Sequence, residues 1–166
     1  MLASVPKALD HVTLRVGSLP LARAFYVDLL GAELLIELDA ELFRRFVPDR
    51  AAEVDDPENS PLHLSVRFGE GPRLDLFLSR RLPGTPTPHP HLALGVPPDR
   101  LDACRDALAA AGIPTDGPRR LGPPGQASLY FADPWGNLLE LVTMGYPRPI
   151  PIGPPELPPL VHQWTP

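Results

Sequence analysis

The stretch SLYFADPWGNLLELV, residues 128–142, decides the fold. Two short apolar runs flank DPWGN at 133–137, where proline, glycine and side chains that bond their own backbone favour a tight turn. The pattern therefore predicts a β-hairpin. Its second strand, 137–143, is apolar except for Glu140. Because a carboxylate in such a strand is costly to bury unless it is protonated, paired or bound to a cation, Glu140 requires a partner elsewhere in the chain.

The composition excludes several classes of protein. With 166 residues and 43% hydrophobic content, the chain can form one domain or two small fused modules. A net charge of −5 gives no basic footprint for nucleic acid, and no apolar run approaches the roughly 20 residues of a membrane helix. No secretory signal is recognisable, and the single Cys104 excludes an internal disulfide. We expect a cytoplasmic protein that binds neither nucleic acid nor membranes.

The chain repeats one order of elements. Residues 9–16 alternate between apolar and polar, and a helical pattern follows that ends near Gly31; after residue 90, a strand headed by His91 precedes a helical pattern that ends at Gly112. The spacing from His11 to Gly31 nearly equals that from His91 to Gly112. Each half therefore reads strand, helix, strand, strand, strand.

The last hairpin of each half also superposes. Ser65 and Asp75 precede Tyr130 and Glu140 at one common spacing. The expected organisation is a first module at 8–80, a Pro-rich linker at 81–90, a second module at 91–144 and a Pro-rich C-terminal arm at 145–166. The first module carries an insertion at about 39–61, which begins as a strand or a turn of helix and continues from residue 48 as an acidic, exposed loop.

In this duplicated plan, His11 and His91 occupy matching places, and so do Asp75 and Glu140. A single strand histidine is more often satisfied by a hydrogen bond than by a metal, but three suitable residues at repeat-related positions favour a metal site. Imidazole and carboxylate ligate Zn, Fe, Mn, Ni and Co, and two histidines with one carboxylate leave positions open for substrate. We predict that His11, His91 and Glu140 bind one divalent metal ion per chain. Asp75 is either a fourth ligand or a group that supports the ligands.

Further polar side chains alternate toward the same face. Tyr130, paired with the Glu140 strand, could orient substrate or form part of the wall, and we consider Tyr130 and Glu140 the candidate catalytic residues. The candidate substrate-binding residues are Thr13, Arg15, His63 and Arg67; Arg73 also alternates inward. The arginines allow an anionic substrate, or they lie exposed at strand ends, as arginine usually does.

Two segments resemble one known family. LDHVTLRVGSLPLARAFYVDLLGAEL is similar to the first module, and HLALGV with LDACRDALAAAGIP and SLYFADPWGNLLELV to the second module, of the glyoxalase/bleomycin resistance/dioxygenase group, the vicinal oxygen chelate superfamily. The resemblance implies an α+β fold of two paired βαβββ modules, with a curved, cup-like mixed sheet and helices outside. The family's ligand positions fall on His11, His91 and Glu140, and its fourth position falls on Asp75, where glyoxalase-like members carry Glu.

The resemblance implies a metal-dependent enzyme that chelates neighbouring oxygens of a small organic substrate, as a lyase, an isomerase or a ring-cleaving dioxygenase. One alternative is a fosfomycin-type thiol transferase, which shares the His-His-Glu set, the threonine after the first histidine and the tyrosine before the glutamate. Another is a metal-free, bleomycin-type drug-binding protein, although 7% aromatic content weighs against it. Members of the family are usually homodimers, so we expect one here. The arm is expected to be extended, with Trp164 anchoring it on its own domain or on a partner subunit.

Overall fold

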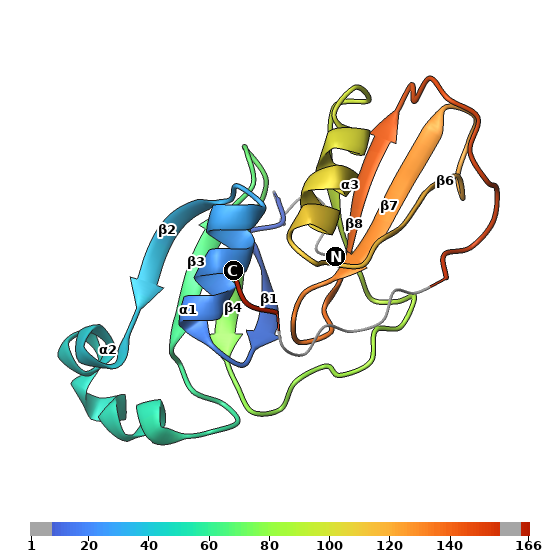
Figure 1. Ribbon diagram of the computed structural model, residues 1–166. Coiled ribbons are helices and arrows are strands. Elements are labelled where there is room, and N and C mark those ends of the chain that lie inside the picture. The colour runs from blue at the N-terminus through green and yellow to red at the C-terminus, as the bar shows by residue number, and fades with distance from the viewer. Residues whose placement is uncertain (1–7, 157–163) are drawn as a thin grey trace, which may run out of the picture. The chain divides into compact units, whose positions relative to one another are not determined.

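The computed structural model describes residues 8–156 and 164–166 (Figure 1). The chain divides into two compact units, Met1–Leu82 and Pro83–Pro166. Each unit contains one four-stranded mixed sheet with helical segments beside it. The predicted α+β class of repeated βαβββ modules is therefore confirmed.

The first unit begins with the predicted strand and helix. Its elements are β1 (His11–Val16), α1 (Leu19–Arg23), the π-helix η1 (Ala24–Leu29), β2 (Glu33–Leu38), α2 (Ala40–Phe46), the 3-10 helix η2 (Pro48–Asp55), β3 (His63–Arg67) and β4 (Arg73–Leu78). The strand order is β1-β4-β3-β2, in which β1 runs parallel to β4 and the other pairs are antiparallel. Ser18 caps the first helix, since its side chain accepts a hydrogen bond from the Leu21 amide at 3.3 Å.

One face of this sheet forms the core of the first unit. The residues that are fully shielded from solvent come from the strands and from the first helical segment, which lies over that face in Figure 1. They are Val16, Ala22, Phe25, Tyr26, Leu64, Val66 and Leu76. The opposite face carries the polar residues of β1, β3 and β4, as the alternation predicts.

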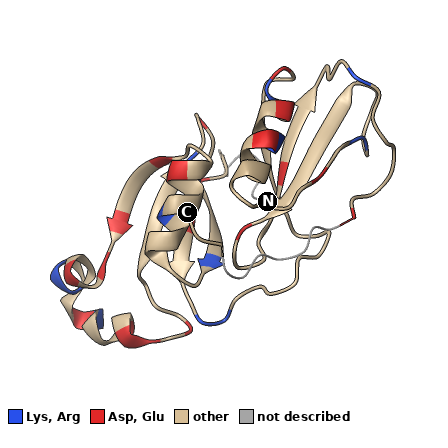
Figure 2. Ribbon diagram, in the orientation of Figure 1, with Lys and Arg blue, Asp and Glu red and all other residues tan. Residues whose placement is uncertain are grey.

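The insertion is more ordered than its sequence suggests. Asp39 caps α2 by accepting a hydrogen bond from the Leu42 amide at 2.7 Å. The exposed loop predicted from residue 48 is wrong over η2, where a proline in the first turn and a bidentate contact between Arg50 and Glu53, at 2.7 and 2.6 Å, favour a helical turn. Figure 2 shows acidic and basic residues interspersed along the ribbon of this insertion.

The second unit repeats the plan without an insertion. Its elements are β5 (Leu92–Gly95), α3 (Leu101–Ala110), β6 (Asp116–Arg119), β7 (Gln126–Ala132) and β8 (Leu138–Met144), with strand order β5-β8-β7-β6. Strands β7 and β8 form the predicted hairpin. In its turn, the buried Asp133 carboxylate accepts hydrogen bonds from the amides of Trp135 and Asn137, at 3.0 and 2.8 Å. These contacts make the DPWGN turn a rigid unit.

Strand register confirms the internal repeat. Thr13 pairs with Asp75 in the first unit, and Ala93 pairs with Glu140 in the second. His11 and His91 each stand two residues before the strand residue that faces the carboxylate. Ser65 pairs with Asp75 and Tyr130 with Glu140. Every repeat equivalence predicted from spacing therefore holds in the backbone pairing.

The described part of the arm lies on its own unit. Arg120 and Ile152 form a parallel bridge, in which the Arg120 amide donates to Pro151 O at 2.8 Å and the Gly153 amide donates to Arg120 O at 3.0 Å. The segment thus lies beside β6, at the edge of the sheet. Trp164 is 6% exposed and donates its indole N–H to Ala111 O at 2.8 Å, as expected of an anchor. The intervening residues 157–163 lie outside the described part of the chain.

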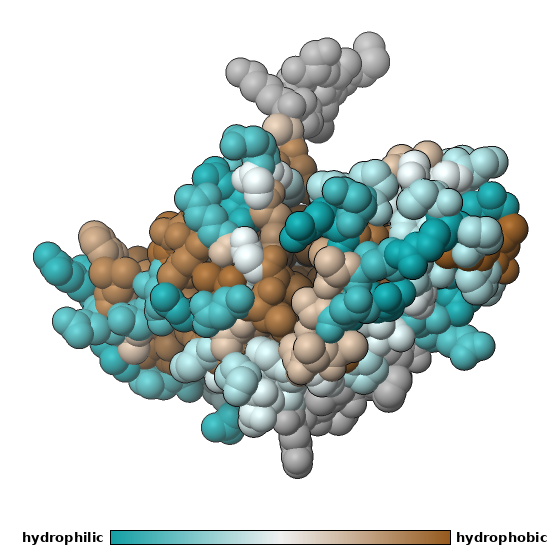
Figure 3. Space-filling model, turned by 45° about the horizontal axis from the view of Figure 1, so that its top comes forward, coloured by the Kyte–Doolittle hydropathy of each residue, from teal (hydrophilic) through white to brown (hydrophobic). Residues whose placement is uncertain are grey.

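The surface mixes polar and apolar side chains, and brown apolar areas are interrupted by teal hydrophilic ones in Figure 3. Large apolar residues that remain exposed include Phe46 on α2 and Ile152 on the arm, at 68% and 71%. Among the residues that the structure describes, no helix combines the length and the apolar character needed to cross a membrane.

Candidate metal centre

Glu140 has a partner in the second unit. It is 6% exposed on β8, and its Oε2 atom lies 3.0 Å from Nε2 of His91, which immediately precedes β5. The parallel pairing of β5 with β8 brings the two side chains to the same face of the sheet. The partner required by the sequence is therefore a histidine from the neighbouring strand.

Both side chains of this pair are oriented by further hydrogen bonds. Nδ1 of His91 lies 2.9 Å from the carbonyl oxygen of Pro88, and Ser128 donates its hydroxyl to Oε1 of Glu140. Gln126 in turn donates to the Ser128 hydroxyl at 2.8 Å. Hydrogen bonds of this kind orient metal-ligating histidines and carboxylates in proteins. Ser128 and Gln126 were not among the predicted site residues, although both alternate with Tyr130 along β7.

Tyr130 lies directly across the strand pair from Glu140. It is 3% exposed, and burial raises the pKa of its hydroxyl, with the nearby Glu140 carboxylate acting in the same direction. The ring also packs edge-on against His91, with a centroid separation of 6.2 Å. Tyr130 therefore presents a protonated hydroxyl beside the His91–Glu140 pair at neutral pH.

In the first unit, His11 is exposed at the start of β1. Its Nδ1 atom lies 2.8 Å from Oδ1 of Asp10. This hydrogen bond, and then the charge of Arg73, keep the pKa of the Asp10 carboxyl below its ordinary value. Asp10 remains ionised and accepts the Nδ1 hydrogen, which leaves Nε2 of His11 as the ring nitrogen that can bind a metal ion.

Asp75 is engaged within its own sheet. It is 4% exposed, and its Oδ1 atom accepts hydrogen bonds from the Ser65 hydroxyl at 2.6 Å and from Nε of Arg73 at 2.9 Å. The same contact with Asp75 raises the pKa of Arg73. Asp75 was expected at the family's fourth ligand position, and its pairing with Arg73 was not predicted. The signal was present, because residues 73 and 75 share one face of a strand.

The candidate substrate-binding residues share the polar face of the first sheet. Thr13 lies opposite Asp75, and Arg15 lies opposite Phe77. His63 contacts the Phe77 ring, with centroids 4.5 Å apart, and its Nδ1 atom lies 2.8 Å from Pro61 O. Arg67 pairs with Glu33 at 2.8 Å, which is the strand-end situation that the sequence left open. No described contact assigns a ligand to any of them.

Each predicted ligand carries a donor atom of a kind that divalent metal ions bind. His11 and His91 each have Nδ1 in a hydrogen bond with an oxygen acceptor, so both can present Nε2, and Glu140 is oriented by Ser128. Within each unit taken by itself, the described residues hold no three His, Cys, Asp or Glu side chains placed to bind one metal ion. The predicted ligands come from both units, and the combination of His11 with His91 and Glu140 stays a prediction.

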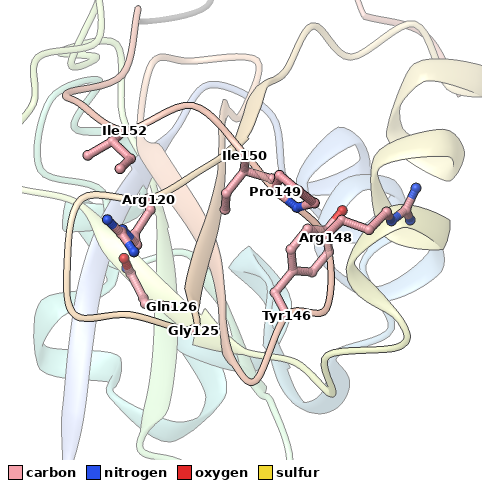
Figure 4. Close-up of a pocket in the computed structure, with 8 residues that line it drawn as sticks. All are labelled: Arg120, Gly125, Gln126, Tyr146, Arg148, Pro149, Ile150 and Ile152. Carbon is pink, nitrogen blue, oxygen red and sulfur yellow. The ribbon is translucent and has the colours of Figure 1, made fainter.

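A separate pocket lies where the arm crosses the start of β7 (Figure 4). Its volume is about 170 Å³, and it is lined by Arg120, Gly125, Gln126, Tyr146, Arg148, Pro149, Ile150 and Ile152. The Tyr146 hydroxyl and the Arg148 guanidinium both contact the carboxylate of Asp102 on α3. Gln126 belongs both to this pocket and to the hydrogen-bond chain that ends at Glu140.

Comparison with solved structures supports this fold. The fosfomycin resistance protein FosX from Listeria monocytogenes, complexed with Mn(II) and sulfate, is 19% identical, with a TM-score of 0.62 over 84% of this chain and 91% of that one. A superfamily member from Sphaerobacter thermophilus is 23% identical, with a TM-score of 0.59 over 84% and 98% of the two chains. A glyoxalase/dioxygenase from Nostoc punctiforme is 23% identical, with a TM-score of 0.58 over 85% and 92%.

A comparison with curated proteins found no significant match. The model of one family matches residues 8–141, which include every predicted ligand and nearly all of both repeats. The chain therefore belongs to the glyoxalase/bleomycin resistance protein/dioxygenase superfamily.

Proposed function

We propose that this protein is a divalent-metal-dependent enzyme that binds two neighbouring oxygens of a small organic substrate and acts as a lyase, an isomerase or a ring-cleaving dioxygenase. The observation that carries the proposal is the contact between His91 Nε2 and Glu140 Oε2 at 3.0 Å, in which both side chains are oriented by further hydrogen bonds. Two adjacent, oriented donors of this kind are what a metal ion requires.

His11 is the proposed third ligand. Its ring is oriented by Asp10 in the way that the His91 ring is oriented by Pro88 O, and the register makes the two histidines equivalent. Three protein ligands leave coordination positions for substrate. A divalent metal, which is Fe, Zn, Ni, Mn or Co, would supply Lewis-acid polarisation of the substrate oxygens.

The chain's own residues supply the remaining roles. Tyr130 keeps its proton because burial raises the pKa of its hydroxyl, so it can donate a hydrogen bond to a substrate oxygen next to Glu140. In the first unit, Thr13 and His63 present a hydroxyl and an imidazole on the polar face of the sheet. Arg15 and Arg67 lie on that same face and are the proposed contacts for an anionic substrate group.

The test begins with metal content. The full chain, purified without chelator, is expected to contain about one metal ion per chain, and His11→Ala, His91→Ala and Glu140→Ala are each expected to lose it. Arg81→Ala, a substitution at an exposed residue that is not a predicted ligand, serves as the control. If the wild-type chain is folded but binds Mn(II), Zn(II), Fe(II), Ni(II) and Co(II) no better than the three variants do, the proposal is overturned.

A substrate screen under air and under nitrogen then separates the reactions. Turnover that requires oxygen indicates a dioxygenase, and turnover that is equal under both gases indicates an isomerase or a lyase. The second candidate, a fosfomycin-type thiol transferase, rests on the predicted His-His-Glu set and on Tyr130 facing Glu140. Consumption of fosfomycin only when a thiol is present would support it.

A metal-free, drug-binding protein is the non-enzymatic alternative. It predicts tight binding of hydrophobic drugs without metal, and it gives no role to the oriented His91 and Glu140.

We further propose a homodimer, on the basis of family membership. Light scattering of the full chain at several concentrations tests the dimer independently of any activity.

A further inference from the structure

The two halves of the repeat treat their equivalent carboxylates differently. Glu140 faces His91, whereas Asp75, at the matching place, accepts hydrogen bonds from Arg73 and Ser65. The difference arises two residues earlier in the same strand. His11 pairs with Arg73 in the first unit, and extending the β5–β8 register by one residue sets His91 beside Leu138 in the second.

Arg73 therefore lies between the first histidine and the first carboxylate. Its Nε atom is 2.9 Å from Oδ1 of Asp75, and a terminal nitrogen is 3.8 Å from Oδ1 of Asp10, which orients His11. Leu138, which is 4% exposed, offers no comparable contact to Glu140. A guanidinium bound to a carboxylate competes directly with a cation for the same oxygen lone pairs.

Resting on the proposed metal centre, we propose that Arg73 is a positioning residue that withholds Asp75 from the metal ion. The site then has three protein ligands, although the chain carries carboxylates at both positions that a four-ligand site would use, Asp75 and Glu140. Withholding Asp75 leaves one more coordination position for substrate oxygens or water.

Ser65 acts in the same direction as Arg73. Its hydroxyl donates to the same Oδ1 atom at 2.6 Å, and Asp75 is only 4% exposed, so the carboxylate is satisfied without any metal. Ser128 also donates to Glu140, but there the second carboxylate oxygen faces a histidine rather than an arginine. The arginine is thus the element that makes the two halves unequal.

The experiment is a double-mutant cycle on the full chain. Arg73→Leu copies the second unit and releases Asp75, and it is expected to tighten Mn(II) binding roughly tenfold or more, in line with the effects of groups that adjoin metal ligands. Adding Asp75→Asn to Arg73→Leu is expected to remove most of that gain. Water-proton relaxation of bound Mn(II) is expected to report about one fewer exchangeable water in Arg73→Leu than in the wild type or the double variant.

Arg67→Leu is the matched control for charge. Arg67 lies opposite Arg73 on the next strand, its side chain is equally exposed at 38%, and its partner is Glu33 rather than Asp75. If both leucine variants tighten Mn(II) binding equally, the effect is only electrostatic and the inference is overturned. Equal binding by Arg73→Leu and the double variant also overturns it.

Failure of the proposed metal centre gives a different result. If neither the wild type nor Arg73→Leu binds Mn(II), while circular dichroism shows that both are folded, the proposed metal centre itself is wrong. If Arg73→Leu does not fold, Arg73→Gln, which keeps a polar side chain but loses the charge, carries the same expectations.

Discussion

Nε2 of His91 lies 3.0 Å from Oε2 of Glu140, while the other ring nitrogen contacts the carbonyl oxygen of Pro88. A carbonyl oxygen only accepts hydrogen bonds, so Nδ1 carries the ring hydrogen and Nε2 is left to bind a metal ion beside Glu140. We therefore expect His91→Gln, which lacks this ring nitrogen, to weaken Zn(II) binding by at least roughly tenfold, measured by calorimetric titration of the full chain. Arg81→Ala is the control, and equal Zn(II) affinity in the wild type and His91→Gln contradicts this prediction.

The Ser128 hydroxyl is expected to support metal binding through Glu140. Ser128→Ala removes the donor to Oε1, and loss of such a supporting contact typically weakens metal binding by roughly 10- to 100-fold. Ser65→Ala is the control, because the Ser65 hydroxyl donates to Asp75, the equivalent carboxylate, which we propose Arg73 withholds from the metal ion. Mn(II) titrations of both variants make the comparison. An equal loss in both would show that the two carboxylates serve the metal alike.

Tyr130 gives a test that needs no metal. Its pKa is raised above 10.0, chiefly by burial, so the folded protein keeps a proton that the unfolded chain releases. Stability should therefore fall as the pH rises above about 10, and it should fall less steeply in Tyr130→Phe. Tyrosinate absorbance of the wild type minus that of the variant is expected to show a midpoint above this value. A midpoint at or below the ordinary value would contradict the buried position of the hydroxyl.

The hairpin turn has one position at which only glycine fits. Gly136 has a φ of +95°, and a Cβ atom there would overlap the carbonyl oxygen of Gly84, whose amide donates to Trp135 O at 3.1 Å. Gly136→Ala should lower the free energy of unfolding by more than roughly 3 kcal/mol. Gly145 has a φ of +83° but open space around it, so Gly145→Ala should cost only about 1–2 kcal/mol. Urea unfolding followed by tryptophan fluorescence measures both variants, since both tryptophans lie in the second unit. Equal losses of stability in the two variants would contradict the close approach of the Gly84 backbone to the turn.

Trp164 should contribute to the stability of the second unit. Trp164→Ala empties a site that is 6% exposed and should cost roughly 3–5 kcal/mol. Trp164→Phe keeps most of the packing but loses the donor to Ala111 O, and it should cost about 1 kcal/mol. Thermal and urea unfolding of the two variants measures the difference. Unchanged unfolding in both would mean that the arm does not anchor there in solution.

Strand patterns predicted most of the backbone in this protein. Alternation with a period of two fixes which residues share a face, and one constant spacing fixed both the Ser65–Asp75 and the Tyr130–Glu140 pairs before the register was seen. The turn at 133–137 was equally plain, because its residue types admit few other conformations. Helical order in the insertion was missed, since it depends on one cap at Asp39 and one ion pair at Arg50, not on periodicity.

The sequence predicted which side chains share a face of each sheet, but not their contacts, and the ligand roles stay a prediction. Spacing brought Glu140 and His91 together and placed Asp75 at the matching position. It could not show that Arg73 binds Asp75, because that depends on side-chain conformations that no period encodes. The orienting contacts of Asp10 and Ser128 were missed for the same reason.

The backbone beside β6 also has a consequence for how the protein behaves at high concentration. An open strand edge can recruit a second chain and start a fibril, and here the arm hydrogen-bonds to Arg120 at that edge. Because Pro149, Pro151 and Pro154 have no amide hydrogen, the outer side of the arm offers few donors to a further strand. We therefore expect the proline-rich arm to disfavour pairing of a further strand at this edge.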